Sequence, residues 1–285
     1  MSPRAKPDDI LLEVADLSVT FSTAKGPVQA VRGVSFRLGR EKLGIVGESG
    51  SGKSQTGRAI LGLTGASSTV EATTLDFAGI DLRRASKRTW RSVRGSRISM
   101  IMQDPKYSLN PVMTVGRQLV EAARVKKGLG NKAARDAAIA MLEAVRIDDP
   151  ERVFGAYPHE LSGGMGQRAM IAMMLIPDPD VLIADEPTSA LDVTIQLQVM
   201  AIMDRLVEAR GMGLILISHD LELVATFCDR VLVMYGGRVV EELDADRLDD
   251  ARHPYTRGLL DCLPRPEKRG APLAVMERDP AWLDI

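Results

Sequence analysis

The stretch GESGSGKS, residues 47–54, decides the fold of this chain. It follows the short apolar run KLGIVG and precedes TGRAILGL, whose apolar residues have helical spacing. Glycines allow successive backbone N–H groups to turn toward one anion, and the start of the helix adds its partial positive charge. Strand, glycine-rich loop and helix in this order predict an α/β protein with a phosphate-binding loop, formed by Gly47, Glu48, Ser49, Gly50, Ser51, Gly52, Lys53 and Ser54.

Two side chains of this loop carry the expected chemistry. Lys53 is expected to reach the β- and γ-phosphates of a nucleotide, and the hydroxyl of Ser54 to ligate Mg²⁺. The pattern would arise by chance in roughly one chain in a hundred of this length. Its position between an apolar run and a helix lowers that chance further, so the loop is interpreted as a nucleotide site rather than a tight turn.

The stretch VLIADEP, residues 181–187, offers the second half of such a site. Its four apolar residues place Asp185 at the end of a buried strand, where the carboxylate can hold Mg²⁺ directly or through water. Glu186 comes next, and a carboxylate beside a γ-phosphate can polarise a water molecule for in-line attack. The alternative, two acids that only cap a strand, has little weight once a phosphate loop is present.

Two further polar residues follow apolar runs, His219 in LILISHD and Gln103 in SMIMQDP. Strand ends in an open α/β sheet are where ligands collect. A single histidine is nevertheless more often packed or solvent-facing, and a glutamine after an apolar run is usually a strand terminus. Taken alone, these two residues leave both interpretations open.

The rest of the chain alternates between strand and helix patterns. LLEVADLSVTF and VQAVRGVSFRL predict a β-hairpin or meander near the N-terminus. Apolar residues at intervals of three and four predict a helical insert over residues 112–176, with Asn131 as a plausible N-cap. RVLVMYGGRVVEE predicts a closing hairpin around its two glycines.

Composition limits the class of protein. The chain has 285 residues, 45% of them apolar and 26% charged, with a net charge of −1, which argues against a general nucleic-acid binder. Cys228 and Cys262 form no disulfide framework, which indicates reduced thiols in a cytosolic protein. The N-terminus lacks the apolar stretch of a secretory signal, and the longest apolar run, AMIAMMLI, is too short to cross a bilayer. Any membrane span would therefore belong to other chains.

The short motifs of this chain and their order resemble those of the ATP-binding subunits of ABC transporters over residues 11–240. In chain order they are GESGSGKS, MQDP, LSGGMGQR, VLIADEP, SALD and ISHD. The resemblance implies a P-loop NTPase with a RecA-like core, an antiparallel β-subdomain and an inserted α-helical subdomain at about residues 104–176. It implies a nucleotide-binding domain over residues 1–240 and a C-terminal appendage over 241–285. It also implies an ATPase coupled to transmembrane transport, with ATP and Mg²⁺ as cofactors and a head-to-tail dimer that closes on two ATP molecules.

The same resemblance implies roles for single residues around the chain's own ATP. Asp185 becomes the Mg²⁺ aspartate and Glu186 the catalytic base. Gln103 becomes the residue that senses Mg²⁺ and the attacking water and links to the transmembrane partner. His219 becomes the histidine that contacts the γ-phosphate, and Phe21 the aromatic residue that stacks on adenine, with a core phenylalanine as the alternative.

The stretch LSGGMGQR, residues 161–168, is implied to serve the ATP of the partner subunit. Ser162, Gly163 and Gly164 would present a hydroxyl and backbone N–H groups to the γ-phosphate that the partner holds. Asp192 in SALD would belong to the loop that communicates across the dimer.

Three longer stretches resemble the sequences of the oligopeptide, dipeptide and nickel uptake branch of this family. They are MQDPKYSLNPVMTVG, TSALDVTIQLQVM and HPYTRGLL. That branch implies a second homologous ATPase subunit in a heterodimer, two permease subunits, an extracytoplasmic binding protein and a place at the cytoplasmic face of the inner membrane. Peptides are the first expectation for the solute, with nickel or metallophore complexes, opines and glycosides as alternatives.

Two positions depart from the branch. Many members carry a C-terminal cysteine cluster that is sometimes assigned to an iron–sulfur site, whereas Cys262 stands alone here, so no cluster is predicted. Gly166 stands where the branch has arginine, and glycine inside a helix costs about 1 kcal/mol relative to alanine. The helix that begins at LSGG is therefore expected to be slightly softened.

Two other classes of protein fit less well. Soluble ABC-type ATPases that act on nucleic acid or ribosomes tend to have two nucleotide domains in one chain, long coiled coils or zinc-binding cysteines, and the sequence has none of these. A P-loop kinase or GTPase would make LSGGMGQR accidental, and NKAA at Asn131 lacks the aspartate of a guanine-reading motif. The sequence favours a transport ATPase.

Overall fold

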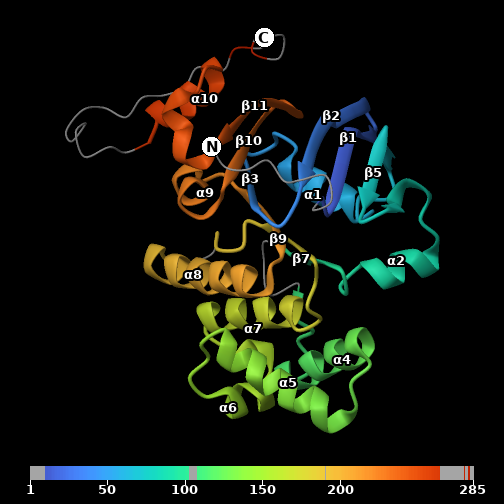
Figure 1. Ribbon diagram of the computed structural model, residues 1–285, viewed down its shortest axis with the longest axis vertical. Helices are drawn as coiled ribbons and strands as arrows, with labels where there is room; N and C mark the ends of the chain where they lie inside the picture. Colours follow the sequence, from blue (N-terminus) through green and yellow to red (C-terminus); the bar gives the residue numbers. More distant parts are fainter. Residues whose placement is uncertain (1–9, 103–107, 190, 264–278, 280–281, 283–285) are drawn as a thin grey trace. The chain divides into compact units, whose positions relative to one another are not determined.

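The computed structural model describes residues 10–102, 108–189, 191–263, 279 and 282. The chain forms two compact units, one made of residues 1–84 and 216–285 and the other of residues 85–215. Figure 1 shows the helices and strands of both units, and each unit is described by itself.

The first unit begins with an antiparallel sheet, as the alternating N-terminal segments predict. Strand β1 (Leu12–Thr23) pairs antiparallel with β2 (Gly26–Leu38) and, on its other edge, with β4 and β5. The register of β1 against β2 shifts between Val14 and Leu17, which explains why the alternation of apolar residues is only partial. The sheet is completed by short strands at β4 (Ser68–Glu71), β5 (Thr74–Phe77) and β6 (Ile80–Asp81), followed by a 3₁₀ turn at Leu82–Arg84.

A second group of strands in this unit carries the phosphate loop. The buried strand β3 (Lys42–Val46) runs parallel to β10 (Arg230–Tyr235), and β10 pairs antiparallel with β11 (Arg238–Asp244), which confirms the predicted closing hairpin. Helix α9 (Leu221–Phe227) packs against β3 at Gly44, where a Cβ would lie 2.0 Å from a methyl group of Val224. The other helical segments of the unit are α1 (Lys53–Ile60), a 3₁₀ segment at Ala245–Asp250 and α10 (Pro254–Asp261).

The second unit combines buried strands with helices. Strand β7 (Ile98–Ile101) runs parallel to β8 (Val181–Asp185), and β9 (Gly213–Ser218), within which the two units divide, neighbours β8. All residues of these three strands are buried. The helices are α2 (Lys87–Val93), α4 (Val115–Lys127), α5 (Asn131–Ala144), α6 (Pro150–Gly155), α7 (Gly163–Leu175) and α8 (Val193–Arg210), with a 3₁₀ turn at Pro158–Glu160.

Helices α4 to α7 form the helical insert that the periodicity predicts, and they gather into one cluster in Figure 1. The expected cap of α5 is wrong by one residue. Gly130 is the N-cap, with an extended backbone and a carbonyl that accepts the N–H of Ala134, and Asn131 is the first helical residue. Because Gly130 has no side chain, this helix begins without a side-chain cap.

Candidate nucleotide site

The phosphate loop follows β3 directly, and its glycines are required by the neighbouring backbone. A Cβ at Gly47 would lie 2.2 Å from the carbonyl oxygen of Met234, and one at Gly52 would lie 2.4 Å from that of Ala30. Gly52 is the N-cap of α1 and has φ +99°, a left-handed backbone that side-chain-bearing residues avoid. The loop therefore lies against β10 and β2 at a distance that only glycine allows.

Lys53 lies across this loop. Its side chain is buried, and its ammonium group donates to the carbonyl oxygens of Gly47 at 2.6 Å and Glu48 at 2.8 Å. It also lies 3.4 Å from the Ser51 hydroxyl oxygen. A buried cation at the start of a helix suits an anionic phosphate group, so the loop fits the nucleotide that its sequence predicts.

Replacing Gly52 by alanine is expected to lower both stability and nucleotide affinity. The left-handed backbone alone costs about 1–2 kcal/mol, and the overlap with the Ala30 carbonyl adds to it because the overlapping atom belongs to the backbone and not to a flexible side chain. Gly50→Ala is the matched control, since Gly50 also has positive φ but a Cβ there would meet no heavy atom within 4 Å among the described residues. Chemical unfolding should show the larger loss for Gly52→Ala, and equal losses would contradict the packing argument.

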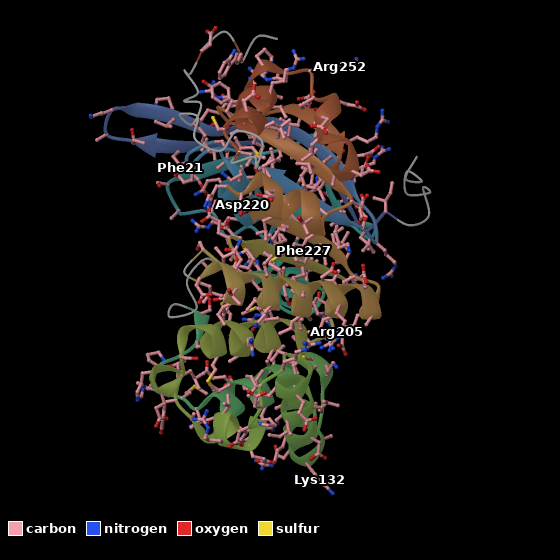
Figure 2. The ribbon with its side chains drawn as sticks, turned by 90° about the vertical axis from the view of Figure 1, so that its left-hand side faces the viewer. Phe21, Lys132, Arg205, Asp220, Phe227 and Arg252 are labelled. Carbon is pink, nitrogen blue, oxygen red and sulfur yellow. The ribbon has the colours of Figure 1, made fainter. Side chains whose placement is uncertain are left out.

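Two other predicted residues belong to the same unit. His219 follows β9 and is exposed, while the next residue, Asp220, caps α9 by accepting the Leu223 N–H at 3.0 Å. Phe21 is half-buried on β1, opposite Val28, and Figure 2 shows it on the N-terminal hairpin. That His219 contacts the γ-phosphate remains a prediction, and so does the stacking of Phe21 on adenine.

The acidic residues end strand β8 in the second unit. Asp185 is the last strand residue and is 2% exposed. Glu186 follows it, half-buried, with φ +46°. A residue other than glycine held in the left-handed region stores about 1 kcal/mol or more, and such strain is concentrated at functional sites. Asp16, Ala78, Arg146 and Asp178 share this backbone conformation, so it is compatible with the catalytic role that the motif predicts for Glu186 but does not by itself indicate that role.

The LSGG stretch begins helix α7. Ser162 is the N-cap, and its hydroxyl oxygen accepts the Met165 N–H at 3.4 Å. Ser162 and Gly163 are exposed, and a Cβ at Gly164 would lie 3.0 Å from a methyl group of Ile195. An exposed helix start with a serine cap is a suitable anion-binding surface, which is the role that the motif predicts.

Asp192 has a local structural role that the motif alone does not indicate. It is the N-cap of α8, and its carboxylate accepts the Ile195 N–H at 3.0 Å. Gln103, the remaining predicted residue, lies outside the described residues.

Two residues with contacts to the predicted motifs were missed by the sequence analysis. The buried side-chain amide of Gln167 donates to the carbonyl oxygen of Pro187 and so links α7 to the turn after Glu186. In the other unit, the hydroxyl oxygen of Tyr255 accepts the backbone N–H of Glu48. Gln167 lies inside a quoted motif and Tyr255 inside HPYTRGLL, but neither pattern says which backbone atom the side chain contacts.

Gly166 of α7 is buried, but the described residues around it leave room for a Cβ. A Cβ there would meet no heavy atom within 4 Å among the described residues. Gly166→Ala is therefore expected to raise the free energy of unfolding by up to about 1 kcal/mol, because alanine favours the helix. Gly116→Ala is the matched control in α4, where a Cβ would lie 2.3 Å from the Phe154 ring, so this change should destabilise. If urea unfolding gave Gly166→Ala a lower free energy of unfolding than the unaltered chain, the expectation that a Cβ fits at position 166 would be contradicted.

The predicted residues thus fall into two groups. The phosphate loop, His219 and Phe21 belong to the first unit, and Ser162, Gly163, Gly164, Asp185, Glu186 and Asp192 belong to the second. Among the residues that the structure describes, no helix combines the length and the apolar character that a bilayer span requires.

Comparison with known proteins gives concordant results. A family model described as "ABC transporter" matches residues 31–189. The oligopeptide transport ATP-binding protein OppD of Salmonella typhimurium is 45% identical over 96% of this chain and 82% of its own length. The dipeptide transport ATP-binding protein DppD of Bacillus subtilis is 48% identical over 95% of this chain and 82% of its own length. A dimeric ATP-binding cassette, MJ0796 bound to ADP and Pi, has the same fold, with a TM-score of 0.73, 24% identity, and coverage of 82% of this chain and 99% of that one.

Proposed function

We propose that this chain, which belongs to the ABC transporter family, is the ATP-hydrolysing motor subunit of a bacterial importer for peptides. The observation that carries the proposal is the phosphate loop itself, with Lys53 buried across it and glycines where the backbone admits no side chain. The names of the relatives, oligopeptide and dipeptide transport ATP-binding proteins, support peptides as the solute.

ATP hydrolysis coupled to transport is the activity of this family, and the proposed site residues divide its tasks. Lys53 binds phosphate, and Glu186 orients and deprotonates the attacking water. Ser54 and Asp185 supply a hydroxyl and a carboxylate, the oxygen donors that Mg²⁺ prefers. When bound, the metal ion neutralises charge on the phosphates.

The proposed motor works as a dimer of nucleotide-binding subunits. Ser162, Gly163 and Gly164 of each subunit complete the ATP site of the other, and Asp192 lies in the segment that communicates between them. ATP binding closes the dimer, the segment around Gln103 transmits closure to two permease subunits at the cytoplasmic face of the membrane, and hydrolysis resets the cycle.

The partnership can be tested by activity measurements. The isolated chain is expected to hydrolyse ATP weakly, and activity is expected to rise when the second homologous subunit is added, because each site needs groups from two chains. A stable homodimer with full activity would contradict the heteromeric proposal.

The solute can be tested through the binding protein that delivers it. We expect peptides to raise the melting temperature of the cognate binding protein in a thermal-shift screen against di- to pentapeptides, Ni²⁺ with and without metallophores, opines and glycosides. If nickel complexes, opines or glycosides raised the melting temperature and peptides did not, the solute would not be a peptide. The assignment of this chain as an ATPase would be unaffected.

A further inference from the structure

A buried tyrosine of the C-terminal segment contacts the phosphate loop. Tyr255 of α10 is fully buried, and its hydroxyl oxygen accepts the backbone N–H of Glu48 at 2.9 Å. The two residues lie 207 positions apart and belong to the same compact unit. The roles proposed above for the nucleotide site make no use of this contact.

The peptide group between Gly47 and Glu48 is hydrogen-bonded through both of its polar atoms. Its N–H donates to Tyr255, and its carbonyl oxygen, that of Gly47, accepts the ammonium group of Lys53 at 2.6 Å. Hydrogen bonds on opposite sides of one peptide group polarise it and strengthen each other. Tyr255 therefore acts on the peptide group that holds the phosphate-binding lysine.

The orientation of Tyr255 is fixed by its neighbours. Its ring centroid lies 4.5 Å from that of Tyr235 and 5.9 Å from that of Trp282. Its backbone N–H donates to Nδ1 of His253 at 3.2 Å, and Nε2 of the same ring lies 3.2 Å from the carbonyl oxygen of Trp282. Packing and hydrogen bonding thus hold the tyrosine in one place.

The hairpin β10–β11 connects the start of α10 to the loop by a second route. The carboxylate of Glu241 in β11 accepts the backbone N–H groups of Arg252 at 2.7 Å and His253 at 3.2 Å. Figure 2 labels Arg252 near the top of the view. At the turn of the same hairpin, the Gly237 N–H donates to the carbonyl oxygen of Ser51 at 3.1 Å. The C-terminal segment is therefore hydrogen-bonded to a hairpin that itself supports the loop.

We infer that Tyr255 is a positioning residue of the nucleotide site. Its hydroxyl fixes the Gly47–Glu48 peptide group, and through it the place from which Lys53 reaches the phosphates. The C-terminal segment thereby contributes to nucleotide affinity as well as to the fold. Because Tyr255 contacts no reacting atom, its effect falls on binding and not on the chemical step.

The test compares Tyr255→Phe with Tyr235→Phe in the full chain. Both changes remove one phenolic hydroxyl from the same aromatic cluster, but that of Tyr235 lies 3.5 Å from the carbonyl oxygen of Asp279 and not on the loop. For Tyr255→Phe, calorimetry is expected to show a loss of ADP affinity of up to about tenfold, the upper limit for one hydrogen bond. With the partner subunits present, KM for ATP should rise in the same ratio while kcat changes by less than about twofold.

Three outcomes of that comparison would overturn the inference: unchanged ADP affinity in Tyr255→Phe, an equal loss in Tyr235→Phe, or a fall in kcat at unchanged KM. Failure of the unaltered chain to bind ADP would count against the nucleotide site itself and not against Tyr255 alone.

Hydrogen exchange in the unaltered protein gives a second measurement that needs no variant. The Glu48 amide should be protected in the nucleotide-free chain because it donates to a fully buried hydroxyl. If Glu48 exchanged at the rate of an unstructured exposed amide, the contact with Tyr255 would be absent in solution and the inference would fail.

Discussion

Glu186→Gln is expected to retain ATP binding and to lower hydrolysis by about 10²–10⁴-fold, the contribution of a general base. The amide keeps the length and shape of the side chain but cannot accept a proton from water. Nucleotide affinity should persist because the phosphate loop and Lys53 are unchanged. Binding is measured by titration with a fluorescent ATP analogue, and turnover by phosphate release in the presence of the second subunit.

The matched control for this change is Glu222→Gln, which removes the same charge from an exposed residue in the first turn of α9. Its turnover should stay within about twofold of the unaltered chain, as expected for a surface substitution. Near-normal hydrolysis by Glu186→Gln would show that another group activates the water.

Ser162→Arg is expected to leave ATP binding by the isolated chain nearly intact and to abolish closure of the dimer. Ser162 is exposed at the start of α7, so a longer side chain can be accommodated in the single subunit. In the closed dimer, arginine would occupy the space of the partner's γ-phosphate and displace the helix start. We expect turnover with the second subunit to fall by about 10²–10³-fold, as when a group that stabilises the transition state is lost.

Ser162→Ala separates this blocking effect from the loss of the helix cap. Alanine removes the hydroxyl that accepts the Met165 N–H, which should lower stability by about 1 kcal/mol without introducing bulk. Closure is measured by ATP-dependent dimer formation in size-exclusion chromatography, in a Glu186→Gln background so that ATP persists. Loss of ATP binding by Ser162→Arg as a monomer would place this stretch at the chain's own nucleotide and refute the proposed sharing.

The local patterns of this chain predict its elements well where one physical rule dominates. The alternation in residues 11–38 predicts the β1–β2 hairpin, and the glycines after Tyr235 predict the β10–β11 turn, because side-chain burial and positive φ act within a few residues. The periodicity of the insert likewise predicts α4 to α7. The predicted cap of α5 is wrong because asparagine favours caps in general, whereas the N-cap is one residue earlier, at Gly130, and Asn131 is the first helical residue.

The site was predictable only as far as its motifs extend. GESGSGKS indicates the loop and Lys53, and VLIADEP places Asp185 at a buried strand end, since both depend on short-range order. The motifs do not reveal that Asp192 caps α8. Nor do they reveal that Gln167 contacts Pro187, because that contact joins elements 20 residues apart and depends on how α7 packs.

The left-handed backbone of Glu186 bears on which side chains fit this position with least strain. Asparagine and aspartate adopt positive φ several times more readily than other residues with side chains. Either would relieve the backbone at this position, yet each has a side chain one methylene shorter than glutamate. Under the proposed role of Glu186 as catalytic base, the reach of its carboxylate would favour glutamate at a position where the backbone favours a shorter side chain.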